Sequence, residues 1–269
     1  MLTRFRQHLN RDRRYTGGGR KRSRKLQRLP FYRRCAPGAP ERLAAIDKRI
    51  LVSMRNEFMY VRVPKCANST IVLMLGLQEL GLDGAHWAGL PPAEQRLFFT
   101  ETLKKGTFRH PSELTTSETG TALERYQRVM FVRNPFTRVA SAYLDKVASG
   151  KYERLVGLPG STTFTEFCEY LAGGGLRRNI HWLPQTLINP FPIDSLDMIG
   201  RFENLDADLA DLSRRLHGRE QSPIALADHA THAGEHIVRL YGEHERRIIA
   251  ELYSDDFTAF GYDADVLPG

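Results

Sequence analysis

The fold is decided by the stretch Tyr60-Val61-Arg62-Val63-Pro64-Lys65-Cys66-Ala67-Asn68-Ser69-Thr70. Its β-rich start predicts a strand over residues 58–63, and the apolar run beyond it predicts a helix from Ser69 to Leu80. A loop with one lysine and two hydroxyls thus leads into a helix N-terminus, where unpaired N–H groups and the helix dipole favour an anion. The loop lacks the glycines of the G-x-x-x-x-G-K-S/T motif, so it points to a phosphate- or sulfate-bearing ligand and away from an ordinary ATPase.

A second strand and helix place another cation in the same kind of position. Residues 129–133 are a short apolar run that ends in Arg133, and Asn134 is a suitable helix cap. Ser141 follows Arg133 by eight residues on the predicted helix. Because ligands of open α/β sheets bind beyond the carboxyl ends of strands, the two motifs predict a ligand with two separated anionic groups. The alternative is that Lys65 and Arg133 are solvated charges.

The remaining pattern predicts the fold class. A third strand is predicted over Asp197–Phe202, a helix from Asn204 or Asp206 to Gly218, and a long helix over Glu235–Tyr253. The polar segment Thr107–Thr121 is predicted to be a loop. Strands that alternate with helices predict an α/β domain over residues 41–269, with a P-loop-like three-layer fold and a mainly parallel central sheet flanked by helices.

Composition separates a basic N-terminal segment from this domain. The chain has 269 residues and a net charge of +8, but residues 1–40 alone hold thirteen Lys and Arg and one acid, Asp12. We predict a flexible basic arm there, which is either a solvated tail or a binding segment for an anionic membrane surface, nucleic acid or an acidic polymer. No apolar run suits a transmembrane segment or a signal peptide, and three cysteines form neither a zinc pattern nor a disulfide framework.

Four segments together resemble the PAPS-dependent carbohydrate sulfotransferases of the type 2 family, which includes chondroitin and uronyl 2-O-sulfotransferases. Val63–Thr70 is similar to their 5′-phosphosulfate loop, and Val132–Tyr143 to their 3′-phosphate strand and helix. His181-Trp182-Leu183-Pro184-Gln185 and Ile199–Leu205 are similar to two further family segments. The resemblance spans about residues 58–262, and its motifs occur in the family's order.

The resemblance implies a donor, a reaction and a set of site residues. The donor would be 3′-phosphoadenosine 5′-phosphosulfate (PAPS), with PAP as product and no metal. Its 5′ end would be held by Lys65, Cys66, Ala67, Asn68, Ser69 and Thr70, and its 3′-phosphate by Arg133 and Ser141. The reaction would be in-line sulfuryl transfer to a hydroxyl of a carbohydrate or glycolipid, with Lys65 stabilising charge on the leaving oxygen.

An acceptor hydroxyl also needs a general base, most often a histidine or carboxylate. We rank His110 first, because related uronyl enzymes carry a catalytic histidine at about this distance before the 3′-phosphate strand. His181 is second, because it lies inside a matched motif, and His86 is third. Cys66 is interpreted as a small loop residue, since no base for a thiol nucleophile can be identified.

The chain also departs from the family, whose eukaryotic members have a membrane anchor and disulfides. This difference predicts a bacterial-type cytoplasmic enzyme, soluble or peripheral on a membrane through its basic arm. Two alternatives remain at this point. One is a kinase or other nucleotide-dependent transferase that uses the same anion site, and the other is a nucleic-acid-binding protein that acts through the arm. Neither the acceptor sugar nor the oligomeric state follows from the sequence.

Overall fold

The computed structural model describes residues 13–82, 84–98, 106–150, 153, 157–218 and 239–268. Within them lies one four-stranded sheet with the order β1-β2-β3-β4. The strands are β1 (Ile50–Ser53), β2 (Phe58–Val61), β3 (Gln127–Val132) and β4 (Met198–Arg201). β2, β3 and β4 are parallel, whereas β1 runs antiparallel to β2. The predicted α/β class with a mainly parallel sheet is confirmed, and β1 is a strand that the sequence pattern did not reveal.

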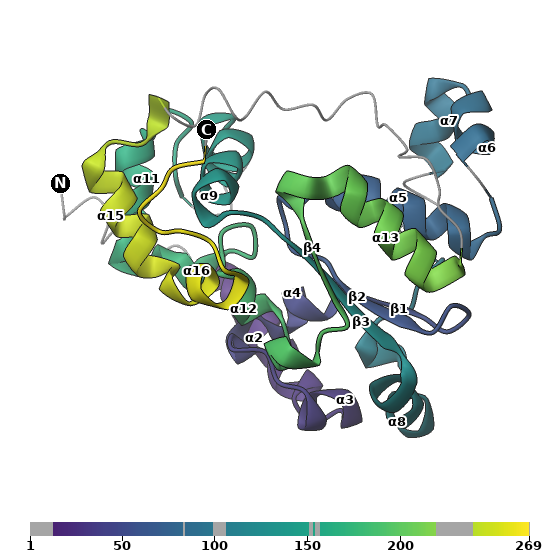
Figure 1. Ribbon diagram of the computed structural model, residues 1–269. Helices are drawn as coiled ribbons and strands as arrows, with labels where there is room; N and C mark the ends of the chain where they lie inside the picture. Colours follow the sequence, from purple (N-terminus) through teal and green to yellow (C-terminus); the bar gives the residue numbers. More distant parts are fainter. Residues whose placement is uncertain are drawn as a thin grey trace.

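Helices cover both faces of this sheet, as Figure 1 shows. One face packs through Phe58, Tyr60 and Phe131 against α5 (Asn68–Glu79) and α13 (Leu205–His217). Residues that alternate with these on the strands form the opposite core. That core is covered by α3 (Pro30–Arg34), α4 (Leu43–Asp47), α8 (Thr116–Arg125) and α12 (Gln185–Ile188). The parallel strands are therefore buried on both sides, which explains their nearly continuous apolar sequences.

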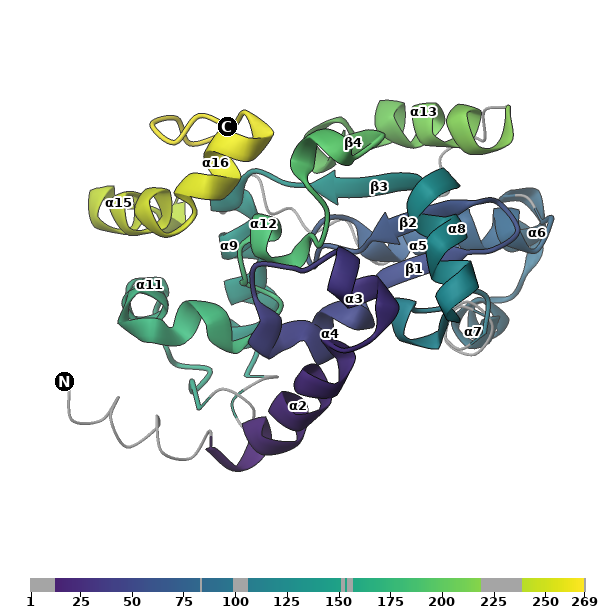
Figure 2. The ribbon, with the colours of Figure 1, turned by 90° about the horizontal axis from the view of Figure 1, so that it is seen from below.

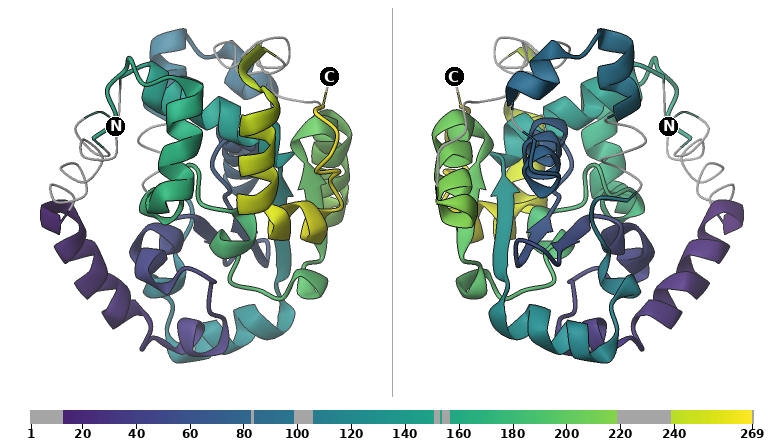
Figure 3. Two further views of the ribbon diagram at one scale, coloured as in Figure 1. Left: turned by 90° about the vertical axis from the view of Figure 1, so that its left-hand side faces the viewer. Right: turned by 90° about the vertical axis from the view of Figure 1, so that its right-hand side faces the viewer.

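A separate, largely aromatic core lies beyond the carboxyl end of β3. It joins α9 (Pro135–Tyr143), α11 (Phe164–Tyr170), α15 (Glu243–Leu252) and α16 (Ser254–Phe260) around Trp182. The rings of Phe136 and Phe257 lie 5.0 Å apart, and those of Phe167 and Trp182 lie 5.4 Å apart. Figures 2 and 3 show this group of helices standing at one end of the sheet. The loops that leave β2 and β3 thus emerge between the sheet and the aromatic core.

Local sequence predicted most of the elements that flank these loops. α5 and α13 begin and end within about one residue of their predicted bounds, and Gly218 adopts φ 67° at the end of α13. Asn134 caps α9 as predicted, because its Oδ1 accepts a 2.9 Å hydrogen bond from the Phe136 N–H. On the other side of α5 pack the short helices α6 (Gly84–Gly89) and α7 (Pro92–Leu97).

Two predicted segments are wrong. The loop expected over Thr107–Thr121 contains the start of α8, which is nucleated by a capping box between Thr115 and Glu118. The long helix expected over Glu235–Tyr253 is interrupted at Tyr241 and Gly242 within its described part. Tyr241 is buried there and its hydroxyl donates to the Phe136 carbonyl at 2.8 Å, so tertiary packing overrides helix continuity. Residues 219–238 lie outside the described part of the chain.

The basic N-terminal segment is helical from Arg13 onward, in α2 (Arg13–Leu26) and α3. Ser23 of α2 is buried and its hydroxyl accepts from the Ala44 N–H at the start of α4. Phe31 is completely buried, with its ring 6.0 Å from that of Phe191. Residues 1–12 of the predicted arm lie outside the described residues. None of the helices in the described ranges is long and apolar enough to cross a membrane.

We predict that Phe31→Ala lowers the free energy of unfolding by about 3–5 kcal/mol, because it leaves a cavity where α3 meets the core. Urea titration monitored by circular dichroism would measure the change. Leu97→Ala, at a leucine that is 62% exposed on α7, is the matched control and should change the free energy by less than about 0.5 kcal/mol. Equal stabilities of Phe31→Ala and the control would show that α3 does not belong to the core.

Candidate functional site

The loop between β2 and α5 has an unusual backbone. Lys65 and Ala67 adopt φ values of 71° and 48°, in the left-handed region that non-glycine residues rarely enter. Ala67 is the N-cap of α5, and no side chain caps this helix. The N–H groups of its first turn are therefore available to a ligand, and residues 67–70 are partly exposed. Ser69 and Thr70 stand at this opening, as an anion site requires.

Two residues of the loop face inward instead. The Asn68 side chain donates to the Val63 carbonyl and accepts a 3.1 Å hydrogen bond from the Tyr60 hydroxyl. Cys66 is 1% exposed, and burial raises the pKa of its thiol to about 12. The thiol is therefore protonated at neutral pH, in agreement with a packing role. Neither side chain is therefore directed toward an anion at the start of α5.

Arg133 connects this loop to the end of β3. Its Nη1 donates to the Lys65 carbonyl at 3.2 Å and its Nε donates to Thr137 Oγ1 at 2.9 Å. The guanidinium lies 3.9 Å from the centre of the Phe202 ring. Arg133 is only 4% exposed. Ser141 is also buried, and it lies on α9 one turn beyond Thr137. The two anion motifs predicted from the sequence therefore meet at one end of the sheet.

A buried network holds this arrangement in place. Arg138 is fully buried, and its Nε donates to the Pro64 carbonyl at 3.1 Å while its Nη2 donates to the Leu183 carbonyl at 2.8 Å. The Gln185 side chain pairs with both the N–H and the carbonyl of Arg133, at 3.0 and 2.9 Å. The loop, the start of α9 and the segment 181–185 are thus joined by buried hydrogen bonds.

The Lys65 side chain makes an ion pair that the sequence did not predict. Its Nζ lies 3.0 Å from Asp145 Oδ2, and Lys146 Nζ lies 2.9 Å from the same oxygen. Burial lowers the pKa of Lys65 below its ordinary value, and the hydrogen bond to Asp145 only partly opposes this. Burial also disfavours the Asp145 carboxylate, but hydrogen bonds from Lys146 and Lys65 outweigh it and lower its pKa. The one sequence signal for Asp145 is its position one helical turn after Ser141.

His181 lies among the same charges. Its Nδ1 is 2.8 Å from Asn179 Oδ1, so Nδ1 carries the proton and Nε2 is the basic nitrogen. Burial, together with the charges of Arg49, Lys146 and Lys65, lowers the pKa of His181 to about 3. The imidazole is therefore neutral at physiological pH and stands close to the Lys65 ammonium.

The other two candidate histidines are placed differently. His110 Nδ1 lies 3.0 Å from the Ile50 carbonyl, beyond the outer edge of β1. Ile50 pairs with Val61, so His110 is at the carboxyl end of β2 but on the far side of β1 from β3. In the described part of the chain, no hydrogen bond or ion pair joins it to Lys65. His86 lies on α6, with its ring 6.4 Å from that of Phe98.

Comparison with known proteins identifies the family. The sulfotransferase family model matches residues 48–263, which include every motif described above. The chain belongs to the sulfotransferase family. Among the described residues, no group of three or more His, Cys, Asp and Glu side chains could hold a metal ion. A search of solved structures gave no significant match.

Individual relatives are all named carbohydrate sulfotransferases. Carbohydrate sulfotransferase 14 of Danio rerio is 28% identical over 198 residues, which cover 66% of this chain and 51% of the relative. Its Homo sapiens counterpart is 28% identical over 179 residues, covering 60% and 44%. Carbohydrate sulfotransferase 12 of Mus musculus is 25% identical over 254 residues, covering 79% and 59%. The chain thus spans about half the length of these curated relatives.

Proposed function

We propose that this protein transfers a sulfuryl group from PAPS to a hydroxyl of a carbohydrate or glycolipid acceptor. The observation that carries the proposal is the hydrogen bond from Arg133 Nη1 to the Lys65 carbonyl, which brings two anion-binding motifs together at the carboxyl end of the sheet. Membership of the sulfotransferase family supports this reaction, and the names of the relatives support a carbohydrate acceptor.

The residues at the site fit the two anionic ends of PAPS. The uncapped start of α5, with Lys65, Ser69 and Thr70, would hold the 5′ end. Arg133 and Ser141 would hold the 3′-phosphate. Among the described residues, no group accepts a hydrogen bond from Arg133 Nη2, which leaves this nitrogen for a phosphate oxygen.

When bound, PAPS supplies a sulfuryl group that is activated for displacement. The Lys65 ammonium would stabilise the charge that develops on the leaving oxygen. His181 Nε2 would accept the proton of the acceptor hydroxyl. Its pKa of about 3 is too low for an efficient base, but an anionic ligand beside Lys65 favours the imidazolium and would raise that pKa toward the working range. We therefore place His181 ahead of His110, whose role as the base stays a prediction.

Adenosine 3′,5′-bisphosphate (PAP) should raise the melting temperature of the wild-type protein, because the ligand binds only the folded state. Lys65→Met and Arg133→Lys should each weaken PAP binding about 10- to 100-fold, since each removes charge-assisted hydrogen bonds. Calorimetric titration would measure the affinities, with Arg125→Met at an exposed arginine of α8 as the control. Stabilisation by ATP–Mg²⁺ and not by PAP would instead favour the kinase alternative.

His181→Gln should lower kcat by about 10²- to 10⁴-fold while PAP affinity changes little, because a general base acts on the acceptor rather than the donor. His110→Gln is the matched variant at the competing histidine. Labelled PAPS and a panel of glycans, followed by mass analysis, would first identify an acceptor for the rate measurement. Full activity of His181→Gln, together with an inactive His110→Gln, would assign the base to His110.

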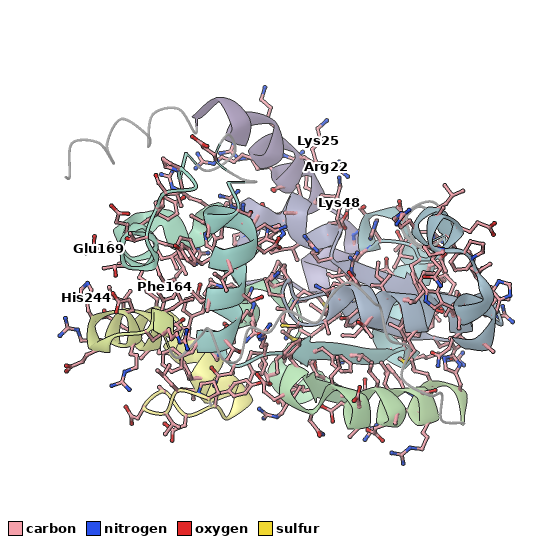
Figure 4. All side chains as sticks on the ribbon, turned by 90° about the horizontal axis from the view of Figure 1, so that it is seen from above. Arg22, Lys25, Lys48, Phe164, Glu169 and His244 are labelled. Carbon is pink, nitrogen blue, oxygen red and sulfur yellow. The ribbon has the colours of Figure 1, made fainter. Side chains whose placement is uncertain are left out.

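We also propose that the basic N-terminal region binds an anionic membrane surface. Helix α2 contains no acidic residue, and Figure 4 shows Arg22 and Lys25 of α2 close to Lys48, which follows α4. All three side chains are exposed. Such a group of cations is attracted to anionic lipid headgroups. An enzyme held at a membrane would have access to glycolipid acceptors.

Neutralising Arg22 and Lys25 together, as Arg22→Gln/Lys25→Gln, should weaken binding to phosphatidylserine vesicles about 30-fold at low salt, at about 1 kcal/mol for each charge. Vesicle sedimentation would measure the effect. Substitution is preferable to truncation, because Phe31 and Tyr32 are part of the core. If the double variant bound the vesicles as tightly as the wild type, the membrane role would be refuted. If the double variant kept vesicle binding but lost binding to RNA, the nucleic-acid alternative would be favoured.

A further inference from the structure

Two lysines share one carboxylate oxygen beside the α5 N-terminus. Lys65 Nζ and Lys146 Nζ lie 3.0 and 2.9 Å from Asp145 Oδ2. The exposed fractions of the Lys65, Lys146 and Asp145 side chains are 17%, 16% and 29%, so the cluster is largely shielded from water. Because both ammonium groups are within hydrogen-bond distance of a single atom, they are close neighbours. One small anionic group could contact both.

The backbone explains how the consecutive residues Asp145 and Lys146 both point toward the region of Lys65. Helix α9 ends at Tyr143 and continues as the π-helical turn η4 (Leu144–Ala148), which contains Asp145 and Lys146. Consecutive residues of an α-helix point about 100° apart, so a regular helix would separate these two side chains. A π turn changes the register of the side chains locally, and such turns occur frequently at functional sites. It lies directly beyond Ser141, on the helix that Arg133 precedes.

Several cations act on one another around this cluster. Lys65 interacts electrostatically with Lys146 and Arg133 as well as with Asp145. The pKa of His181 is affected by the charges of Arg49, Lys146, Lys65 and Asp145. The cations Lys65, Lys146, Arg133 and Arg49 thus act on one another or on His181, and the carboxylates that act on them include Asp145 and Glu203. Like charges held together in a shielded site destabilise the empty protein, and a ligand with several negative charges would relieve their repulsion.

We infer that Lys146 is a second catalytic cation whose ammonium contacts the 5′-phosphosulfate group together with Lys65, and that Asp145 is the positioning residue that holds both. This inference rests on the proposed function. An ammonium has three donor hydrogens, so a lysine that donates to Asp145 can also donate to a ligand. As the acceptor oxygen bonds to sulfur and loses its proton to the base, the bond from sulfur to the 5′-phosphate oxygen breaks. The two lysines would neutralise the charge left on that phosphate.

The position of Lys146 can be tested with two ligands that differ only at the 5′ end. Lys146→Met should weaken PAP binding about tenfold, while the affinity for adenosine 3′-monophosphate stays within about twofold of wild type. Lys146→Arg should keep most of the PAP affinity, because it retains the charge. Lys21→Met, at an exposed lysine of α2, is the control. If Lys146→Met weakened the binding of both ligands equally, the role of Lys146 would be purely structural and the inference would be overturned.

Asp145 can be tested through the pH dependence of PAP binding. Asp145 raises the pKa of Lys65 against the effect of burial, so its removal should lower that pKa further. In Asp145→Asn the loss of PAP affinity at alkaline pH should therefore begin at a lower pH than in wild type, and Asp145→Glu should restore the profile. An unchanged profile in Asp145→Asn would contradict the positioning role.

The outcomes separate this inference from the proposed function. A wild-type protein that binds neither adenosine ligand would refute both. The wild-type protein is expected to bind PAP more tightly than adenosine 3′-monophosphate. If Lys146→Met kept the same ratio of the two affinities, the role of Lys146 would be refuted while the proposed function would stand. Loss of that preference in Lys146→Met, with normal thermal unfolding of the ligand-free variant, would support it.

Discussion

The site depends on two buried guanidinium groups that bind the backbone of one loop. Arg133 donates to the Lys65 carbonyl and Arg138 donates to the Pro64 carbonyl, so successive peptide groups of the β2–α5 loop are fixed from the start of α9. Backbone strain at Lys65 and Ala67 persists only where the surroundings determine the conformation. These two hydrogen bonds supply that constraint, and they make the position of the Lys65 side chain a consequence of the packing of α9.

Burying two cations is costly unless their donors are satisfied. Carbonyl oxygens of Lys65, Pro64 and Leu183 accept most of their hydrogen bonds, whereas Arg138 Nη1 is buried without a hydrogen-bond partner among the described residues. The buried Asp256 carboxylate acts on Arg138 electrostatically and accepts the Gln185 and Thr186 N–H groups at the start of α12. A short chain of contacts therefore connects the donor loop to the C-terminal helices. A substitution of Asp256 in α16 would therefore alter the support of the loop, although no residue of α16 was assigned to the site.

The parts that could be predicted from sequence are those set by local patterns. The apolar runs of β2 and β3, the Asn134 cap and the α5 periodicity are short-range features, and they place Lys65 and Arg133 at the same sheet edge. β1 was missed because its four residues form an apolar run too short to distinguish a strand from a buried helix. The break at Tyr241 depends on a hydrogen bond to a carbonyl 105 residues away. The Asp145–Lys146 pair and the proximity of His181 to Lys65 depend on side-chain packing, which periodicity does not encode.

The charge balance links the stability of the fold to its function. A rigid loop cannot move its lysine away from neighbouring cations, so the repulsion between them persists in the ligand-free protein. A flexible loop would avoid that repulsion by exposing Lys65 to water, and it would then have to reorder when an anion binds. The buried arginines prevent this relaxation. Part of the electrostatic cost of the site is therefore incurred during folding, and an anionic group that enters the site meets cations already held in position.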